Sequence, residues 1–122
     1  MRFPIRFDAP FRLLCKALFL SPDDAHVDVG DDLVHVKFSW GFSATVPRSS
    51  VASMRVYPGR PISRGVHGFA GRWLVNGAGD RILDITFEPE QRARVMGWPV
   101  KLRNLLVSVD DPEALAAAIR PA

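Results

Sequence analysis

The chain has 122 residues, a length that fits a single domain (1–122) with its own hydrophobic core. Its one cysteine, Cys15, excludes an internal disulfide and a metal site built from several thiolates, so we expect a cytoplasmic protein. The formal net charge of +3 is far below that of a dense nucleic-acid-binding surface, and we do not expect nucleic acid as a partner. Arginine outnumbers lysine thirteen to three, which indicates a bacterial genome of high GC content.

Residues 1–24 are expected to form an N-terminal extension with one short helix. The apolar run over 11–20 is interrupted by two basic residues, and no small-residue cleavage site follows it. The run is also about half as long as a bilayer requires, so we expect neither a signal peptide nor a membrane span. It predicts a helix over 10–19 with three side chains facing a core: Phe11, Leu14 and Leu18.

A hairpin is predicted next, because valines alternate with polar residues over 27–29 and 34–38. If the valines share one face, Val29 pairs with Val34 and a two-residue loop, Asp31-Asp32, joins the strands. In this register two outward side chains form an exposed cross-strand pair: Asp28 and His35.

Two more strands continue the pattern. Residues 42–46 pair with 34–38 across a three-residue loop, 39–41, in which Gly41 is available for a left-handed conformation. A fourth strand over 51–57 is expected to point three side chains inward: Ala52, Met54 and Val56.

Residues 58–71 contain four glycines and two prolines and are predicted to form one long loop of a kind that is often functional. Strands return over 72–76, with Trp73 facing the core, and over 83–87. A turn over 77–80 separates them.

The stretch 88–103 fits more than one structure. Residues 89–96 fit a helical turn, whereas the alternation over 100–103 fits a strand extension. A strand continuing into 105–109 would need a bulge near Asn104, because Leu102 and Leu105 are three positions apart.

The C-terminal helix start is marked by an Asp-Pro-Glu sequence. Asp111 can cap the first turn, Pro112 suits the first helical position, and Glu113 suits the positive end of the helix dipole. Four residues are expected to form the apolar stripe that covers a sheet: Ala114, Leu115, Ala118 and Ile119.

Seven antiparallel strands and a terminal helix predict an α+β fold, mainly β, arranged as a small barrel or orthogonal sandwich capped by that helix. The order of elements, together with the ending Leu105-Leu-Val-Ser-Val-Asp-Asp-Pro-Glu-Ala-Leu115, resembles the pleckstrin homology-like (PH-like) domains of uncharacterised bacterial proteins. The resemblance covers about residues 25–120. It implies a binding scaffold without inherent catalysis. The loop 30–32 is acidic where phosphoinositide-binding members carry basic residues, which argues against that ligand.

No motif in the chain predicts an enzyme, a metal site or a cofactor. The histidines lack ligand spacing with a third donor, and the glycines at 65, 68 and 71 do not match a phosphate loop. Cys15 lies in an apolar run that should raise the pKa of its thiol. We therefore expect no catalytic residue.

The remaining candidate is a surface of arginines interleaved with aromatic residues, a composition enriched in protein interfaces. For Trp98 a surface position and a core position are equally expected. The candidate binding residues are Arg55, Tyr57, Arg60, Arg64, His67, Arg72, Arg92, Arg94 and Trp98.

Two functions remain open from the sequence. The first is a non-enzymatic interaction domain that binds a protein or peptide through these residues or through an open sheet edge, where self-association could also occur. The alternative is a small-molecule or lipid carrier with a pocket between the barrel and the N-terminal apolar segment.

Overall fold

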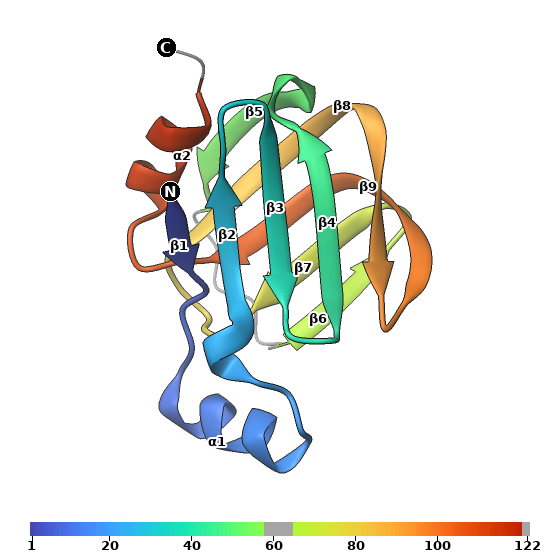
Figure 1. The fold of residues 1–122 in the computed structure, drawn as a ribbon. Helices are drawn as coiled ribbons and strands as arrows, with labels where there is room; N and C mark the ends of the chain where they lie inside the picture. The colour runs from blue at the N-terminus through green and yellow to red at the C-terminus, as the bar shows by residue number, and fades with distance from the viewer. Residues whose placement is uncertain (58–64, 121–122) are drawn as a thin grey trace.

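The computed structural model describes residues 1–57 and 65–120 and is mainly β, with one curled sheet and two α-helices (Figure 1). The helices are α1 (Ala9–Ala17) and α2 (Pro112–Ile119), and two short 3-10 helices are η1 (Pro22–Asp24) and η2 (Arg48–Ser50). The described residues form nine strands in place of the predicted seven: β1 (Arg2–Pro4), β2 (Ala25–Val29), β3 (Leu33–Phe38), β4 (Phe42–Pro47), β5 (Val51–Val56), β6 (Gly65–Phe69), β7 (Arg72–Asn76), β8 (Ile82–Val95) and β9 (Trp98–Ser108).

The long strand β8 organises the sheet because it has two neighbours along one side. The strand order is β1-β2-β3-β4-β8-β9-β7-β6, and β5 pairs with the first part of β8 while β4 pairs with its end. β9 lies between β8 and β7 and runs parallel to β7. The prediction of an all-antiparallel sheet is wrong for this pair. β7 and β8 follow each other in the chain but are not neighbours in the sheet, because β9 lies between them.

The N-terminal segment also belongs to the sheet. β1 pairs with β2, and beyond it Ile5 and Phe7 form isolated bridges to Val109 and Gly77 at the ends of β9 and β7. These bridges connect the first strands to the distant ones and hold the sheet in its curl. Ile5 is buried in the core as a result.

The first two predicted hairpins are confirmed. Val29 pairs with Val34 across the predicted two-residue loop, and β3 pairs with β4 in the predicted register. One detail of the second turn is wrong. Ser39, with a φ of 48°, takes the left-handed conformation that was expected of Gly41.

β5 departs from the predicted alternation. Its register against β8 shifts between Val51 and Ser53, so one extra residue bulges at Ala52. Val51 and Met54, three apart, pack against the core, whereas Ala52 and Val56 are exposed. The expectation that Ala52 and Val56 point inward is therefore wrong.

Part of the predicted loop over 58–71 is a strand. β6 occupies its second half and pairs with β7 through a two-residue turn, Ala70-Gly71, in which both residues have positive φ. Residues 58–64 lie outside the described residues.

The stretch 88–103 is an extended hairpin, and the predicted helical turn over 89–96 is wrong. β8 runs to Val95 and β9 starts at Trp98, with Met96 and Gly97 at φ values of 51° and 84° in the turn between them. The bulge expected near Asn104 is present. Its extra residues belong to β8, where the register shifts between Thr86 and Gln91.

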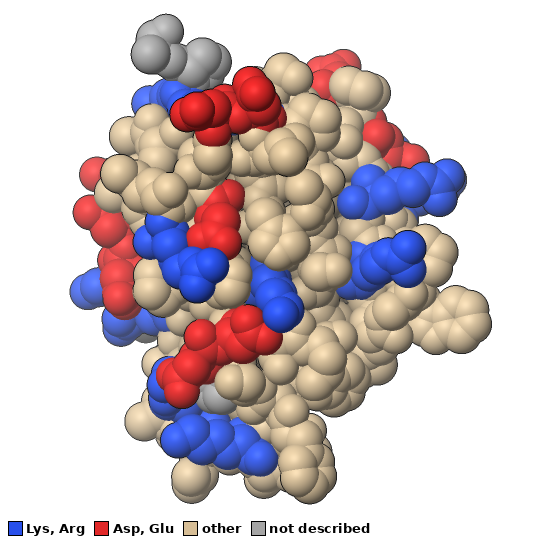
Figure 2. All heavy atoms as spheres, in the orientation of Figure 1, with Lys and Arg blue, Asp and Glu red and all other residues tan. Residues whose placement is uncertain are grey.

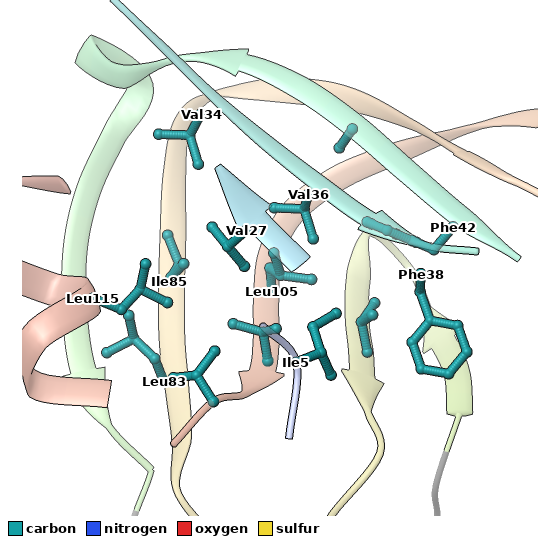
Figure 3. Packing of buried hydrophobic residues seen from close by; sticks show 14 of the residues in the cluster. Ile5, Val27, Val34, Val36, Phe38, Phe42, Leu83, Ile85, Leu105 and Leu115 are labelled. Carbon is teal, nitrogen blue, oxygen red and sulfur yellow. The ribbon is translucent and has the colours of Figure 1, made fainter. Parts of the chain in front are cut away.

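The core fills the concave side of the sheet, and α2 covers it beside β5 and β8. Leu115 points from α2 toward Leu83 and Ile85 of β8 (Figure 3). Leu115 and Ile119 are buried as predicted, but Ala116 is buried in place of Ala114. The carboxylate of Asp111 accepts a bond from the Ala114 N–H at 3.0 Å, which confirms the predicted cap.

α1 projects from the lower end of the sheet in Figure 1. Phe11 stacks on Phe7, which contacts Phe38 of the core, and Cys15 is buried beside them. Leu14 and Leu18 are half exposed, so the prediction that they face the core is wrong. Only the Phe11 and Cys15 side of the helix meets the core.

Candidate functional site

The predicted binding residues that the structure describes are not brought together in one place. Arg60 and Arg64 lie outside the described residues, and His67 belongs to β6. The others divide among three places: Arg55 and Tyr57 at the end of β5, Arg72 at the start of β7, and Arg92, Arg94 and Trp98 on the β8–β9 hairpin.

The β8–β9 hairpin carries a basic outer face. Arg92 lies opposite Lys101, and between Arg92 and Arg94 the side chain of Ala93 is buried. Because side chains alternate along a strand, four cations share the outer face: Arg92, Arg94, Lys101 and Arg103. Trp98, at the start of β9, is 75% exposed, which settles its position as a surface residue.

A shallow pocket of about 460 Å³ lies beside this face. Its wall includes Trp73, which packs against Phe42 as predicted for a core residue and donates its indole N–H to the Lys101 carbonyl at 3.0 Å. The Arg103 guanidinium lies 3.6 Å from the Glu90 carboxylate. Lys101, the third charged residue of the wall, has no acidic partner among the described residues, so the pocket has a small net positive charge.

Arg55 belongs to a polar cluster on the face of β5 and β8 that points away from the core. Its Nε donates to the buried carboxylate of Asp84 at 3.1 Å, and the side-chain amide of Asn104 donates to the same carboxylate. Asp84 is thus held by two partners, as a buried carboxylate requires.

A second groove, of about 390 Å³, lies between β5 and the C-terminal end of α2. Four consecutive β5 residues, 51–54, line it together with Ile119 and Arg120 of the helix end. Consecutive lining residues indicate that the strand edge itself, rather than one face of its side chains, forms the wall.

Among the described residues, no strand pairs with the edge of β5 that faces away from β8. Tyr57 donates its N–H to the Ile82 carbonyl, so the odd-numbered residues 53 and 55 bond β8 as well. The N–H and C=O groups of Met54 and Val56 therefore point away from β8. Among the described strands, β8 is the only one that pairs with β5.

Arg48 fixes the helix end that borders this groove. Its guanidinium donates to the carbonyls of Ala118, Ile119 and Arg120 at 2.6–2.7 Å. These are the last carbonyls of α2, which have no partners within the helix. The groove is therefore bounded on one side by a rigid, charge-compensated helix terminus.

Two of the histidines, His26 and His35, lie on the neighbouring strands β2 and β3, and the cysteine lies in α1. Asp28 lies opposite His35 as predicted, but its carboxylate binds the guanidinium of Arg2, and His35 contacts Thr45 instead. His26 faces outward and is nevertheless buried. Burial also raises the pKa of the Cys15 thiol, as predicted.

Within the part of the chain that the structure describes, no three metal-ligating side chains come together. Neither of the two pockets described above is lined by a residue of α1, so neither is the carrier pocket expected beside the N-terminal segment. That carrier function stays a prediction.

Sequence reasoning missed the shared face of the four cations and the groove beside β5. The first could have been found from the alternation of residues 91–95 and 98–103 about Met96-Gly97, which is a hairpin pattern. The second depends on where α2 lies relative to β5. No local sequence pattern reports that placement.

Across residues 1–57 and 65–120, no helix has both the length and the apolar character needed to cross a membrane. Comparison with known proteins gives no matching family model, no matching curated protein and no matching solved structure.

Proposed function

We propose that the chain is a non-enzymatic interaction module that binds an extended peptide segment of a partner protein in the groove beside β5. The observation that supports this proposal is the open edge of β5, with the outward backbone groups of Met54 and Val56, beside a groove of about 390 Å³. An extended peptide can add to such an edge as a further strand.

The walls of the groove favour a particular kind of peptide. Val51, Met54 and Ile119 contribute apolar surface, which suits small apolar side chains at alternate positions of the added strand. Arg120 lies exposed at the helix end, where it favours an acidic residue near one end of the peptide. The guanidinium of Arg48 is already bonded to helix carbonyls and serves to position the wall.

Membership of the PH-like family is a proposal of the same standing. It rests on the strand-rich order of elements and on the Asp111-Pro112-Glu113 helix start. An interaction module without catalysis is what that resemblance implies.

The proposal can be tested by selecting peptides from a displayed random library against the full chain. Met54→Pro removes an N–H that points away from β8, a position where an edge strand tolerates proline. Ala52→Trp fills the groove, since Ala52 is an exposed residue of its wall. We expect each change to weaken a selected peptide by about tenfold or more, equivalent to about 1.4 kcal/mol.

Ala117→Trp is the matched control, because Ala117 is exposed on α2 outside the groove. The Ala117→Trp variant should bind a selected peptide with the same affinity as the unchanged chain. Selected peptides that bind all three variants equally, with thermal unfolding unchanged, would exclude the β5 groove. Concentration-dependent dimerisation lost in Met54→Pro would assign the edge to a second copy instead.

A further inference from the structure

The exposed large apolar side chains gather at one end of the molecule. Of ten such side chains in the described residues, seven lie on α1 or just after it, in the turns that join β3 to β4 and β8 to β9, or at the first residue of β9. We call this region the apolar end. Its members are Leu13, Leu14, Leu18, Phe19, Trp40, Met96 and Trp98.

Backbone and side-chain bonds connect the three segments of the apolar end. Trp40 donates its indole N–H to the Phe19 carbonyl at 3.1 Å, and Met96 donates its N–H to the Gly41 carbonyl at 3.0 Å. α1 and the two turns lie together at the lower end of Figure 1. The apolar end is therefore one surface made by three parts of the chain.

The exposure of this surface is unusually large. Phe19 is 90% exposed, Trp98 75% and Leu13 72%. At about 200 Å² for a fully exposed large side chain, the seven expose on the order of 900 Å², more than the roughly 300–600 Å² of a typical monomer's largest apolar patch. A surface of this extent indicates a docking site.

Positive charge at the border of the apolar end exceeds the nearby negative charge. Three nearby carboxylates are each engaged by one cation: Asp23 by Arg12, Asp24 by Lys37 and Glu90 by Arg103. Asp8, at the start of α1, is a fourth acidic residue and has an interaction partner of its own. Within the described residues four bordering cations have no acidic partner: Lys16, Arg92, Arg94 and Lys101. Figure 2 shows basic side chains on the right of the view, beside the largely uncharged lower right.

We propose that the apolar end docks onto the surface of a lipid bilayer that contains anionic lipids. Leucine and aromatic side chains would enter the interfacial region, where tryptophan is favoured, and the bordering cations would face the anionic head groups. This site is independent of the groove beside β5. It also differs from head-group binding at the acidic loop over 30–32, which the sequence argues against.

Two observations favour a bilayer over another macromolecule. A symmetric contact between two copies would place the unpaired cations of one copy against those of the other, because such a contact uses the same patch twice. The apolar side chains also project from three separate segments, and a fluid surface can accommodate separate projections. A second copy and a protein partner are therefore the alternatives for the test.

The test is co-sedimentation of the full chain with vesicles of equal parts phosphatidylcholine and phosphatidylglycerol, compared with pure phosphatidylcholine. We expect strong sedimentation with the anionic vesicles, a blue shift of tryptophan emission, and weakening by added salt. The double variant Leu13→Ser, Phe19→Ser should bind at least about tenfold more weakly. Arg92→Gln with Arg94→Gln should lose about fivefold for each charge.

The matched control is Leu33→Ser with Val56→Ser, which removes two half-exposed apolar side chains away from the apolar end. It should bind vesicles like the unchanged chain. The proposal is overturned if the unchanged chain does not sediment with anionic vesicles, or if both apolar double variants bind equally. Sedimentation velocity showing a dimer that only Leu13→Ser, Phe19→Ser dissolves, without vesicle binding, would assign the surface to a second copy.

Discussion

The two helices of this protein are similar in length, with nine residues in α1 and eight in α2, yet they are held in place by different contacts. α2 has its apolar side chains Leu115 and Ile119 buried, a side-chain cap at its start, and the Arg48 guanidinium at its end. α1 buries Cys15 and part of Phe11, and leaves its leucines in solvent. Burial and both termini thus fix α2, whereas an aromatic contact and the neighbouring strand fix α1.

This difference shows that an apolar pattern predicts a helix more securely than it predicts what the helix covers. Short helices gain most of their stability from packing, so an exposed apolar face on α1 needs another occupant or costs solubility. The N-terminal segment compensates through the sheet. Its β1 strand pairs with β2, and Arg6 bonds both Asp80 and Asp110.

The largest expected difference comes from removing one leucine from each helix. Leu115→Ala leaves a cavity against β8 and should lower the free energy of unfolding by about 2–5 kcal/mol. Leu14→Ala removes a half-exposed side chain and should change it by less than about 0.5 kcal/mol. Urea denaturation measures both, and equal losses would mean that the two helices are docked alike.

The Arg48 contacts provide the next largest effect. Arg48→Met keeps the aliphatic stem but leaves the carbonyls of Ala118, Ile119 and Arg120 without their charged donor. Because bonds to a charged group contribute about 1.5–3 kcal/mol, we expect a loss in that range in urea denaturation. Arg48→Lys should recover only part of it, since one ammonium cannot replace the guanidinium fork. An unchanged Arg48→Met variant would show that packing alone holds α2.

The cap at the start of α2 should have a smaller effect. Asp111→Ala removes the acceptor of the Ala114 N–H and should cost about 1 kcal/mol. Asp111→Asn is the control, because it keeps an acceptor oxygen and should lose only a fraction of that amount. Thermal unfolding of the three proteins at neutral pH gives the comparison. If the Asn variant lost as much as the Ala variant, the charge rather than the hydrogen bond would be responsible.

The parts of the fold that the sequence predicted are those fixed by local pattern. Valines at 27, 29, 34 and 36 can share one face in a single register, and Asp111-Pro112-Glu113 is a typical helix start. The wrong predictions needed information from distant residues. Gly68 suggested a loop, but it lies in β6, where a Cβ would come within 2.3 Å of the Trp73 ring. Close approach of another side chain explains this glycine.

The candidate surfaces were harder to predict than the strands. Arg92 and Arg94 were identified as binding residues, but only the strand conformation of 88–95 places them beside Lys101. Composition identifies an arginine-rich, aromatic surface without dividing it among separate elements. The groove beside β5 and the apolar end both form where segments distant in sequence meet. Predicting them therefore requires the topology of the sheet and the positions of the helices.

The smallest predicted effect concerns the N-terminal end and sharpens the contrast with α2. The Arg2 guanidinium bonds the Asp28 carboxylate at 2.7 Å and lowers the pKa of that carboxyl below its usual value. Because the folded pKa is the lower one, the stabilisation is complete above the unfolded value of about 3.9 and is lost as the pH falls through the folded pKa. Acid should therefore loosen the pairing of β1 with β2 and leave α2 in place.

A carboxyl chemical-shift titration by NMR measures this pKa directly, and amide exchange near pH 3 compares β1 with α2. Arg2→Gln should return the pKa of Asp28 toward its usual value, while Arg120→Gln, on the helix end, should not change it. His26 lies 3.4 Å from the same carboxylate, so His26→Gln should raise the pKa of Asp28 by a smaller amount than Arg2→Gln. A pKa of Asp28 at or above the usual value would show that backbone pairing alone retains the N-terminal strand.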